Sequence, residues 1–195
     1  MSIFEEIRDS AEGRELSERW YRYKVKQILG TRGSFRGVMG DAEPHNRGSR
    51  PKWGNMNLFW YQPKTAKKLP YYDLFPIVLP FKKHRNGFTG ISFHYLPIYM
   101  RIKLLNLLDA GYGDENKGRL QVFWKDLQRL KLARPIVRRY LKPNVHSLFL
   151  HISLEDMFVA TLLPVEKFYK GEYRSKRGVS SRVVWNDIKG IMYGT

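Results

Sequence analysis

The basic side chains of this chain gather in four separate segments of the sequence. Guanidinium and ammonium groups neutralise phosphates, and contacts to phosphates carry no information about base sequence. The clusters therefore predict a surface that binds an anion, with the phosphate backbone of double-stranded DNA as the first candidate. The residues are Arg32, Arg36, Arg47, Arg50 and Lys52; Lys82, Lys83 and Arg85; Lys125, Arg129, Arg134, Arg138, Arg139 and Lys142; and Arg174, Lys176 and Arg177.

The third cluster is the densest, and Asp126 is the one acidic residue between residues 125 and 142. If this segment is helical, Lys125 with Arg129 and Arg134 with Arg138 are like-charged pairs four residues apart. Such pairs destabilise a helix unless an anion neutralises them. This spacing favours an anionic partner at this segment.

Patterns for catalysis and metal binding are weak. The metalloprotease, P-loop, nucleophile-elbow and dinucleotide-binding motifs are absent, and the chain has no cysteine to ligate zinc. The carboxylate pairs Asp41/Glu43 and Glu155/Asp156 fit a loop and a helix start better than a metal site, and His94 is expected to be a hydrogen-bonded sheet residue. We expect no enzyme activity, no metal and no cofactor.

The elements that must position these residues indicate an α+β protein. Apolar spacing predicts a helix over residues 3–29, closed by Gly30. Residues 30–54 are rich in Gly and Arg and are expected to be a loop-like basic arm that orders only against a partner. We therefore expect residues 1–54 to form a helix and an arm, and residues 55–195 to form a single α+β domain.

The second part is expected to contain a small antiparallel β-meander, at about residues 55–96, packed with several helices. Strands are predicted at 57–61, 77–79 and 88–95, with a hairpin turn at 63–68 and an Asn-Gly turn within 82–87. After residue 97 the chain is expected to be mainly helical. Predicted helices begin at Pro97 and Pro135, cover the apolar stripe 120–130 and residues 157–163, and end with one capped by Ser180 or Ser181.

Composition limits the class of partner. Lys and Arg number 35 against 18 for Asp and Glu, which gives a net charge of +17. This imbalance indicates nucleic acid, an anionic membrane or an acidic protein surface. No apolar run is long enough to span a bilayer, and the N-terminus carries acidic residues in place of a secretory signal. The chain is therefore not expected to span a membrane; nucleic acid or an acidic protein is the expected partner, with no membrane partner and no small-molecule substrate expected.

Aromatic residues lie between the basic clusters and are candidates for stacking on unpaired bases, although packing in a core is the alternative for each. Phe35 is the least suited to a core because it lies within the predicted arm. The others are Trp53, Trp60 and Tyr173.

Several short motifs resemble a known family, the DNA end protector or head-completion proteins of T-even-type tailed phages and their cyanophage relatives. The motifs are Arg19–Tyr21, Tyr61–Lys64, Leu69–Pro76, Gly87–Pro97 and Arg138–Leu141. The resemblance implies a virion protein, made in the host bacterial cytoplasm, that binds the end of packaged DNA and shields it from exonuclease by occlusion. It implies double-stranded DNA and other virion proteins as partners, and it carries over no catalytic residue.

Two other functions stay open at this point. The chain is alternatively a structural component of the phage neck, tail or baseplate, whose basic surface docks on acidic neighbouring proteins. The third candidate is a metal-dependent nuclease, which would need carboxylates that converge in space.

Overall fold

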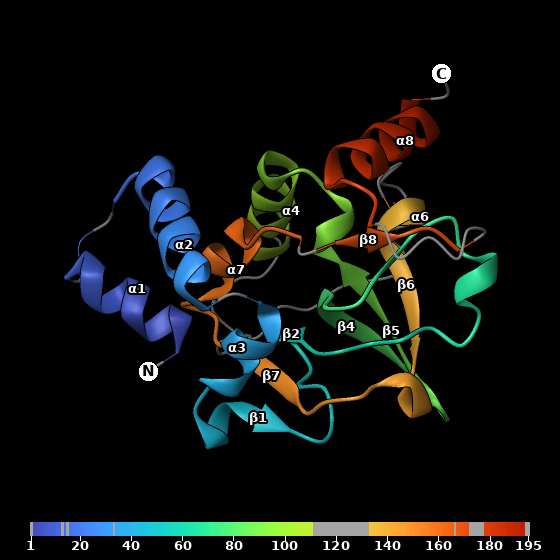
Figure 1. The fold of residues 1–195 in the computed structure, drawn as a ribbon, viewed down its shortest axis with the longest axis horizontal. Coiled ribbons are helices and arrows are strands. Elements are labelled where there is room, and N and C mark those ends of the chain that lie inside the picture. The colour runs from blue at the N-terminus through green and yellow to red at the C-terminus, as the bar shows by residue number, and fades with distance from the viewer. Residues whose placement is uncertain are drawn as a thin grey trace.

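The structure is a computed structural model that describes residues 2–12, 14, 16–32, 34–110, 133–165, 167–171 and 178–193. Three helices begin the chain, and strands and helices are then interspersed, so that α4 (Ile98–Ala110) lies between β5 (Gly87–Ser92) and β6 (Val137–Leu141) in sequence (Figure 1). The buried residues of the N-terminal helices belong to the same core cluster as those of the sheet. The boundary expected at residue 54 stays a prediction.

The N-terminal helical segment is two helices, α1 (Ile3–Ala11) and α2 (Glu18–Arg32), where one was predicted. Ser2 and Glu5 cap α1 reciprocally, because each side chain accepts a hydrogen bond from the backbone N–H of the other, at 3.2 and 2.7 Å. The break follows at Glu12, whose φ of 52° is left-handed and ends the helix. The predicted cap Gly30 lies inside α2.

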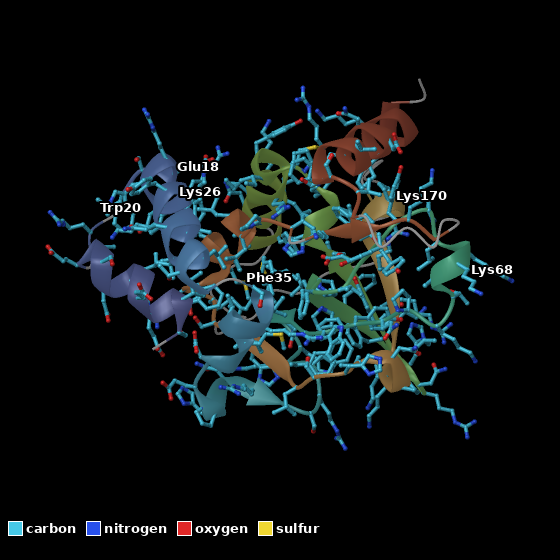
Figure 2. All side chains as sticks on the ribbon, in the orientation of Figure 1. Glu18, Trp20, Lys26, Phe35, Lys68 and Lys170 are labelled. Carbon is cyan, nitrogen blue, oxygen red and sulfur yellow. The ribbon has the colours of Figure 1, made fainter. Side chains whose placement is uncertain are left out.

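The predicted loop-like arm is wrong. Residues 34–54 contain helix α3 (Phe35–Gly40), a 3-10 turn at Pro44–Asn46 and strand β1 (Arg47–Gly48). Phe35 is only 2 % exposed and stacks on Phe75, with ring centroids 6.1 Å apart, and Figure 2 shows it in the interior. Phe35 and Val38 share one face of a short helix, so two apolar side chains fix a segment that its Gly and Arg content assigned to a loop.

Among the described residues, six antiparallel strands form the main sheet in the order β1-β7-β2-β4-β5-β6. The predicted meander is confirmed as β2-β4-β5, and a two-residue turn at Arg85 and Asn86 joins its last two strands, one residue earlier than an Asn-Gly turn would lie. The strands are β2 (Met56–Leu58), β4 (Ile77–His84), β5 (Gly87–Ser92), β6 (Val137–Leu141) and β7 (Phe149–Ile152).

Two expectations about the connections are corrected. Residues 63–68 make no hairpin turn but include a 3-10 turn at Ala66–Lys68. The strands on either side of this segment do not pair with each other: β2 pairs with β4 and β7, and β3 (Tyr72–Asp73) pairs with β8 (Phe168–Tyr169). Pro135 lies in the short helix α6 (Ala133–Ile136), but residues 137–141 continue as β6. Tyr140 then stacks on Phe88 of the adjacent strand at 5.3 Å, a contact that a helix would forfeit.

Helices predicted after residue 97 are present as α4 (Ile98–Ala110), α7 (Met157–Leu162) and α8 (Ser181–Tyr193). In Figure 1, α2, α4 and α8 lie above the sheet, α7 lies between α2 and α4, and α1 lies at the left. The apolar stripe at residues 120–130 lies outside the described residues. In the part of the chain that the structure covers, no helix combines the length and apolarity that a membrane span needs.

Side chains on opposite faces of the sheet join different clusters. Leu79 and Ile91, which are paired, belong to the main core with the helices. Alternation along the strands directs Val78 and Phe88 to the other face. There Phe59 lies at the centre of an aromatic cluster, with centroid distances of 4.8 to 6.2 Å to its neighbours Tyr61, Phe88, Tyr140 and Phe149.

Candidate nucleic-acid interface

Five predicted cations lie at the corner of the sheet where β4 turns into β5, with Lys82 and Arg139 on one face and Lys83 on the other. We call Lys82, Lys83, Arg85, Arg139 and Lys142 the corner cluster, and all five are exposed. The register places Lys82 opposite Thr89 and Thr89 opposite Arg139, so three adjacent strands align these positions on one face. The backbone N–H of Lys142 donates to the Asn86 carbonyl at 2.8 Å, which fixes the end of β6 beside the turn.

The corner cluster has few opposite charges near it. Residues 74–108 and 133–154 contain no Asp or Glu, so strands β4, β5 and β6 supply only positive charge. Within the described part of the chain, no ion pair involves any of the five side chains. Lys82 and Arg139 flank the uncharged Thr89 from the strands on either side of β5, so an anion between them would be attracted by both side chains. The corner is therefore suited to bind phosphates.

Arg138 lies next to the corner but in a different setting. Successive residues of a strand point to opposite faces, so Arg138 points away from the side occupied by Arg139. The Arg138 guanidinium lies 4.3 Å from the ring centroid of Tyr95, a cation–π contact. Its Nε is buried and has no acceptor among the described residues. The Tyr95 ring therefore holds Arg138 in place, and the Nε–H of Arg138 is a hydrogen-bond donor without an acceptor among the described residues.

A pocket of about 520 Å³ runs beside β6, the last strand of the sheet. One wall is β6 from Val137 to Leu141, and the other is the segment between Tyr61 and Asp73. Asn86 closes the end next to the corner cluster, and its side-chain oxygen accepts a hydrogen bond from Arg139 at 3.1 Å. The pocket and the corner cluster therefore form one continuous surface.

Lysines of the segment at 63–68 were missed as candidates. Lys64 lines the pocket, and Lys67 and Lys68 are exposed on the 3-10 turn next to it. Figure 2 shows Lys68 and Lys170 projecting outward along the same edge of the molecule. Three lysines within five residues were a visible signal, but their interpretation as a hairpin turn placed them away from the other basic segments.

The cations of the predicted arm lie apart from the corner. Arg47 donates hydrogen bonds to the carbonyls of Gly40 and Ala42, so it closes the end of α3. Arg36 lies over the Trp60 ring at 4.4 Å, and among the described residues this is the one cation–π contact between a predicted cation and a predicted stacking aromatic. Arg50 and Lys52 are exposed near β1, at the opposite edge of the sheet from β6.

Several predicted site residues are not placed. Lys125, Arg129, Arg174, Lys176, Arg177 and the stacking candidate Tyr173 lie outside the described residues, as do the side chains of Arg32 and Arg134. The expected helical pairing of Arg134 with Arg138 is wrong, because the first is in α6 and the second is in β6.

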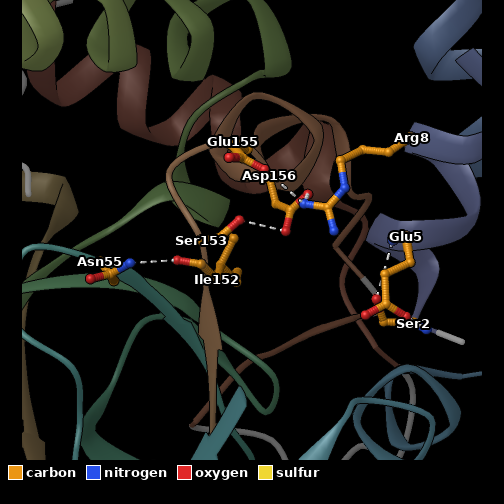
Figure 3. Close-up of polar contacts among 8 residues, drawn as sticks. All are labelled: Ser2, Glu5, Arg8, Asn55, Ile152, Ser153, Glu155 and Asp156. Carbon is orange, nitrogen blue, oxygen red and sulfur yellow. Dashed lines mark hydrogen bonds and ion pairs between the residues drawn. The ribbon is translucent and has the colours of Figure 1, made fainter. Parts of the chain in front are cut away.

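The carboxylate pair Glu155/Asp156 holds two helices together (Figure 3). Arg8 of α1 forms ion pairs with both carboxylates, at 3.3 and 2.9 Å, and Ser153 Oγ donates to Asp156 at 2.6 Å. Asp156 is the residue that precedes α7, which agrees with the expected helix start at this pair. Asp41 and Glu43 follow α3. Among the described residues, no three His, Cys, Asp or Glu side chains are grouped to hold a metal ion.

Two further polar groups are buried in the core and serve structure. His94 is fully buried, and its Nδ1 lies 2.6 Å from Asp73 Oδ2, which confirms the expected hydrogen bond. His94 lies in a 3-10 turn (Phe93–Tyr95), however, and not in a strand as predicted. Burial lowers the pKa of His94 more than Asp73 raises it, so the neutral ring donates from Nδ1. Arg101 is also fully buried and donates to the carbonyls of Leu96, Thr161 and Leu163.

Comparison with known proteins identifies one family. A family model described as Phage T4 terminal DNA protecting protein matches residues 5–188. No curated protein and no solved structure matches the chain. The matched range contains the whole sheet, the corner cluster and the pocket beside β6.

Proposed function

Because the chain belongs to the family of the phage T4 terminal DNA protecting protein, we propose that it binds the ends of linear double-stranded DNA and shields them from exonucleases. The observation that supports this most directly is the corner cluster. Two segments about fifty residues apart in sequence bring five exposed cations to one edge of a sheet whose strands carry no acid at that edge.

The proposed mechanism is occlusion, without a chemical step. Lys and Arg side chains that reach phosphates bind any sequence and release counterions, so the affinity falls steeply with salt. A protein bound in this way across a terminus keeps an exonuclease from reaching the last phosphodiester bonds. This mechanism needs no catalytic residue, no metal and no cofactor.

We further propose the setting in which this activity serves the phage. The protein is made in the host cytoplasm, joins the virion during head completion and stays at the end of the packaged DNA. Other virion proteins then meet faces of the molecule that the DNA leaves free. The exposed Arg50 and Lys52, at the far edge of the sheet, are available for such contacts.

The experiment is an exonuclease protection assay combined with a mobility-shift assay. Blunt linear duplex and the same sequence as a closed circle are incubated with the protein at 50 and 200 mM salt. We expect binding and protection of the linear form at 50 mM, weaker binding at 200 mM, and less binding to the circle. Absence of binding at 50 mM would contradict the proposal and favour a structural protein that docks on acidic neighbours. Equal binding to circles would remove end recognition, and cleavage of the circle in the presence of magnesium would indicate a nuclease.

A further inference from the structure

A protein that prefers DNA ends has to contact a group that the interior of a duplex lacks. Internal phosphates are diesters with a single charge. A 5′-terminal phosphate is a monoester, and it carries a charge of about −1.5 to −2 near neutral pH, with three acceptor oxygens. The corner cluster fits the diesters along the backbone but does not by itself distinguish an end from the interior.

The pocket beside β6 has the size for a single terminal nucleotide. Its volume of about 520 Å³ lies within the usual range for small-molecule sites and is too small for a duplex. It adjoins the corner cluster through Asn86 and Arg139. A duplex whose backbone lies on the corner therefore has its last nucleotide within reach of the pocket.

The charged groups of the pocket favour an anion. Lys64, Arg138 and Arg139 line it from two different elements. Asp73 is the one acid among the described lining residues, and both of its oxygens are engaged: Oδ2 pairs with His94 at 2.6 Å, and Oδ1 accepts the Phe75 N–H at 2.9 Å. Arg138 is only partly buried, and its Nε, which is buried, has no acceptor among the described residues.

The aromatic groups of the pocket fit a base. Tyr72 lines it and stacks on Tyr169 of β8, with centroids 5.5 Å apart and planes 22° from parallel, so its ring is held in a fixed orientation. Burial raises the pKa of the Tyr72 hydroxyl, which stays protonated and able to donate. Stacking on such a ring tolerates any base, which agrees with binding that does not depend on sequence.

We propose that this pocket holds the 5′-terminal nucleotide of the bound duplex, with its phosphate monoester on Arg138 and Lys64 and its base against Tyr72. The inference rests on the proposed function and assigns its end-recognition element. The corner cluster supplies the affinity for the duplex, and the pocket supplies the preference for a phosphorylated end.

The test uses a DNA hairpin with a fluorescein in its loop and one blunt end, which carries a 5′-phosphate, a 5′-hydroxyl or a 3′-phosphate. Dissociation constants of the full chain are measured by fluorescence anisotropy. We expect the 5′-phosphate to tighten binding about tenfold over the 5′-hydroxyl, as a charge-assisted contact to the monoester would. The 3′-phosphate should have no such effect.

Variants locate the preference. Arg138→Gln and Lys64→Gln should bind both ends with equal affinity, whereas Arg50→Gln, an exposed arginine near the opposite edge of the sheet, should keep the tenfold preference. Thermal melting checks that each variant is folded. Lys64 is exposed on a loop, so its variant tests the pocket even if the half-buried Arg138 proves necessary for folding.

The outcomes separate the two proposals. If the wild-type protein binds ends but ignores the 5′-phosphate, or if Lys64→Gln keeps the preference, the pocket assignment is wrong and end binding stands. A preference for the 3′-phosphate would overturn the 5′ assignment. If no hairpin binds at 50 mM salt, the proposed function itself fails.

Discussion

Removing two positive charges from the corner cluster should weaken DNA binding and reduce its salt dependence. The variant Lys83→Gln/Arg85→Gln suits this test because both side chains are exposed and neither takes part in an ion pair among the described residues. Lys83 projects from β4 and Arg85 from the turn, so their loss leaves the strand pairing intact.

The magnitude follows from the number of phosphates that the corner can neutralise. Each contact contributes about −0.9 to the slope of log K against log salt, so five cations predict about −4.5 and three predict about −2.7. At 0.1 M salt the same relation gives a loss of roughly 60-fold in affinity for the double variant. Between 50 and 200 mM salt the wild-type protein should lose roughly 500-fold and the variant roughly 40-fold.

The assay is a salt series of anisotropy titrations with a short, internally labelled blunt duplex. The matched control is Arg50→Gln/Lys52→Gln, which removes the same charge near the opposite edge of the sheet. Its slope should match that of the wild type. If both double variants lower the slope equally, binding depends on net charge alone and the corner has no special role. If neither changes it, the phosphates lie elsewhere on the molecule.

Three further predictions concern the fold that supports the site. Phe59→Ala should lower the free energy of unfolding by about 3–5 kcal/mol in denaturant titrations, because it empties the centre of the aromatic cluster; an unchanged midpoint would contradict that packing. Gly90→Ala should cost about 1–3 kcal/mol, because the new Cβ would lie 2.8 Å from the Leu79 carbonyl oxygen, whereas Gly40→Ala meets open space and should cost far less. Stability should fall as the pH drops below about 6.5, because burial lowers the pKa of His94 in the folded state and the unfolded chain then binds the extra proton. His94→Gln should flatten that part of the pH profile, and a profile with an unchanged slope would show that another group titrates.

Local sequence patterns were sufficient to predict the central strands of the sheet. The apolar run at Ile77–Leu79 lies within β4, and the Asn86-Gly87 signal lies within one residue of the observed turn, so the sequence predicts β4, β5 and their connection locally. Residues 137–141 carry apolar pairs that suit a helix equally well. Pairing with β5, a segment about fifty residues away, decides for the strand.

The candidate site depended on such long-range pairing even more. The sequence placed the five cations in two separate clusters, one with Lys82, Lys83 and Arg85 and the other with Arg139 and Lys142. The two clusters lie side by side because β6 pairs with β5, and no local sequence pattern indicates that pairing. The same holds for Asp73 and His94, which are 21 residues apart and meet in the core. Lys64 belonged to a segment whose turn was misassigned, so its place beside β6 could not be anticipated.

The position of β6 at the end of the sheet has a consequence for solubility as well as for binding. An edge strand presents unpaired backbone groups that a second copy of the chain can extend into a larger sheet, and charged side chains on that strand oppose such pairing. Arg138 and Arg139 lie at the middle of β6, so the residues that face the proposed ligand also keep copies from joining edge to edge. Bound DNA would cover this edge, whereas variants that neutralise both arginines leave it bare and are expected to self-associate, which light scattering would detect.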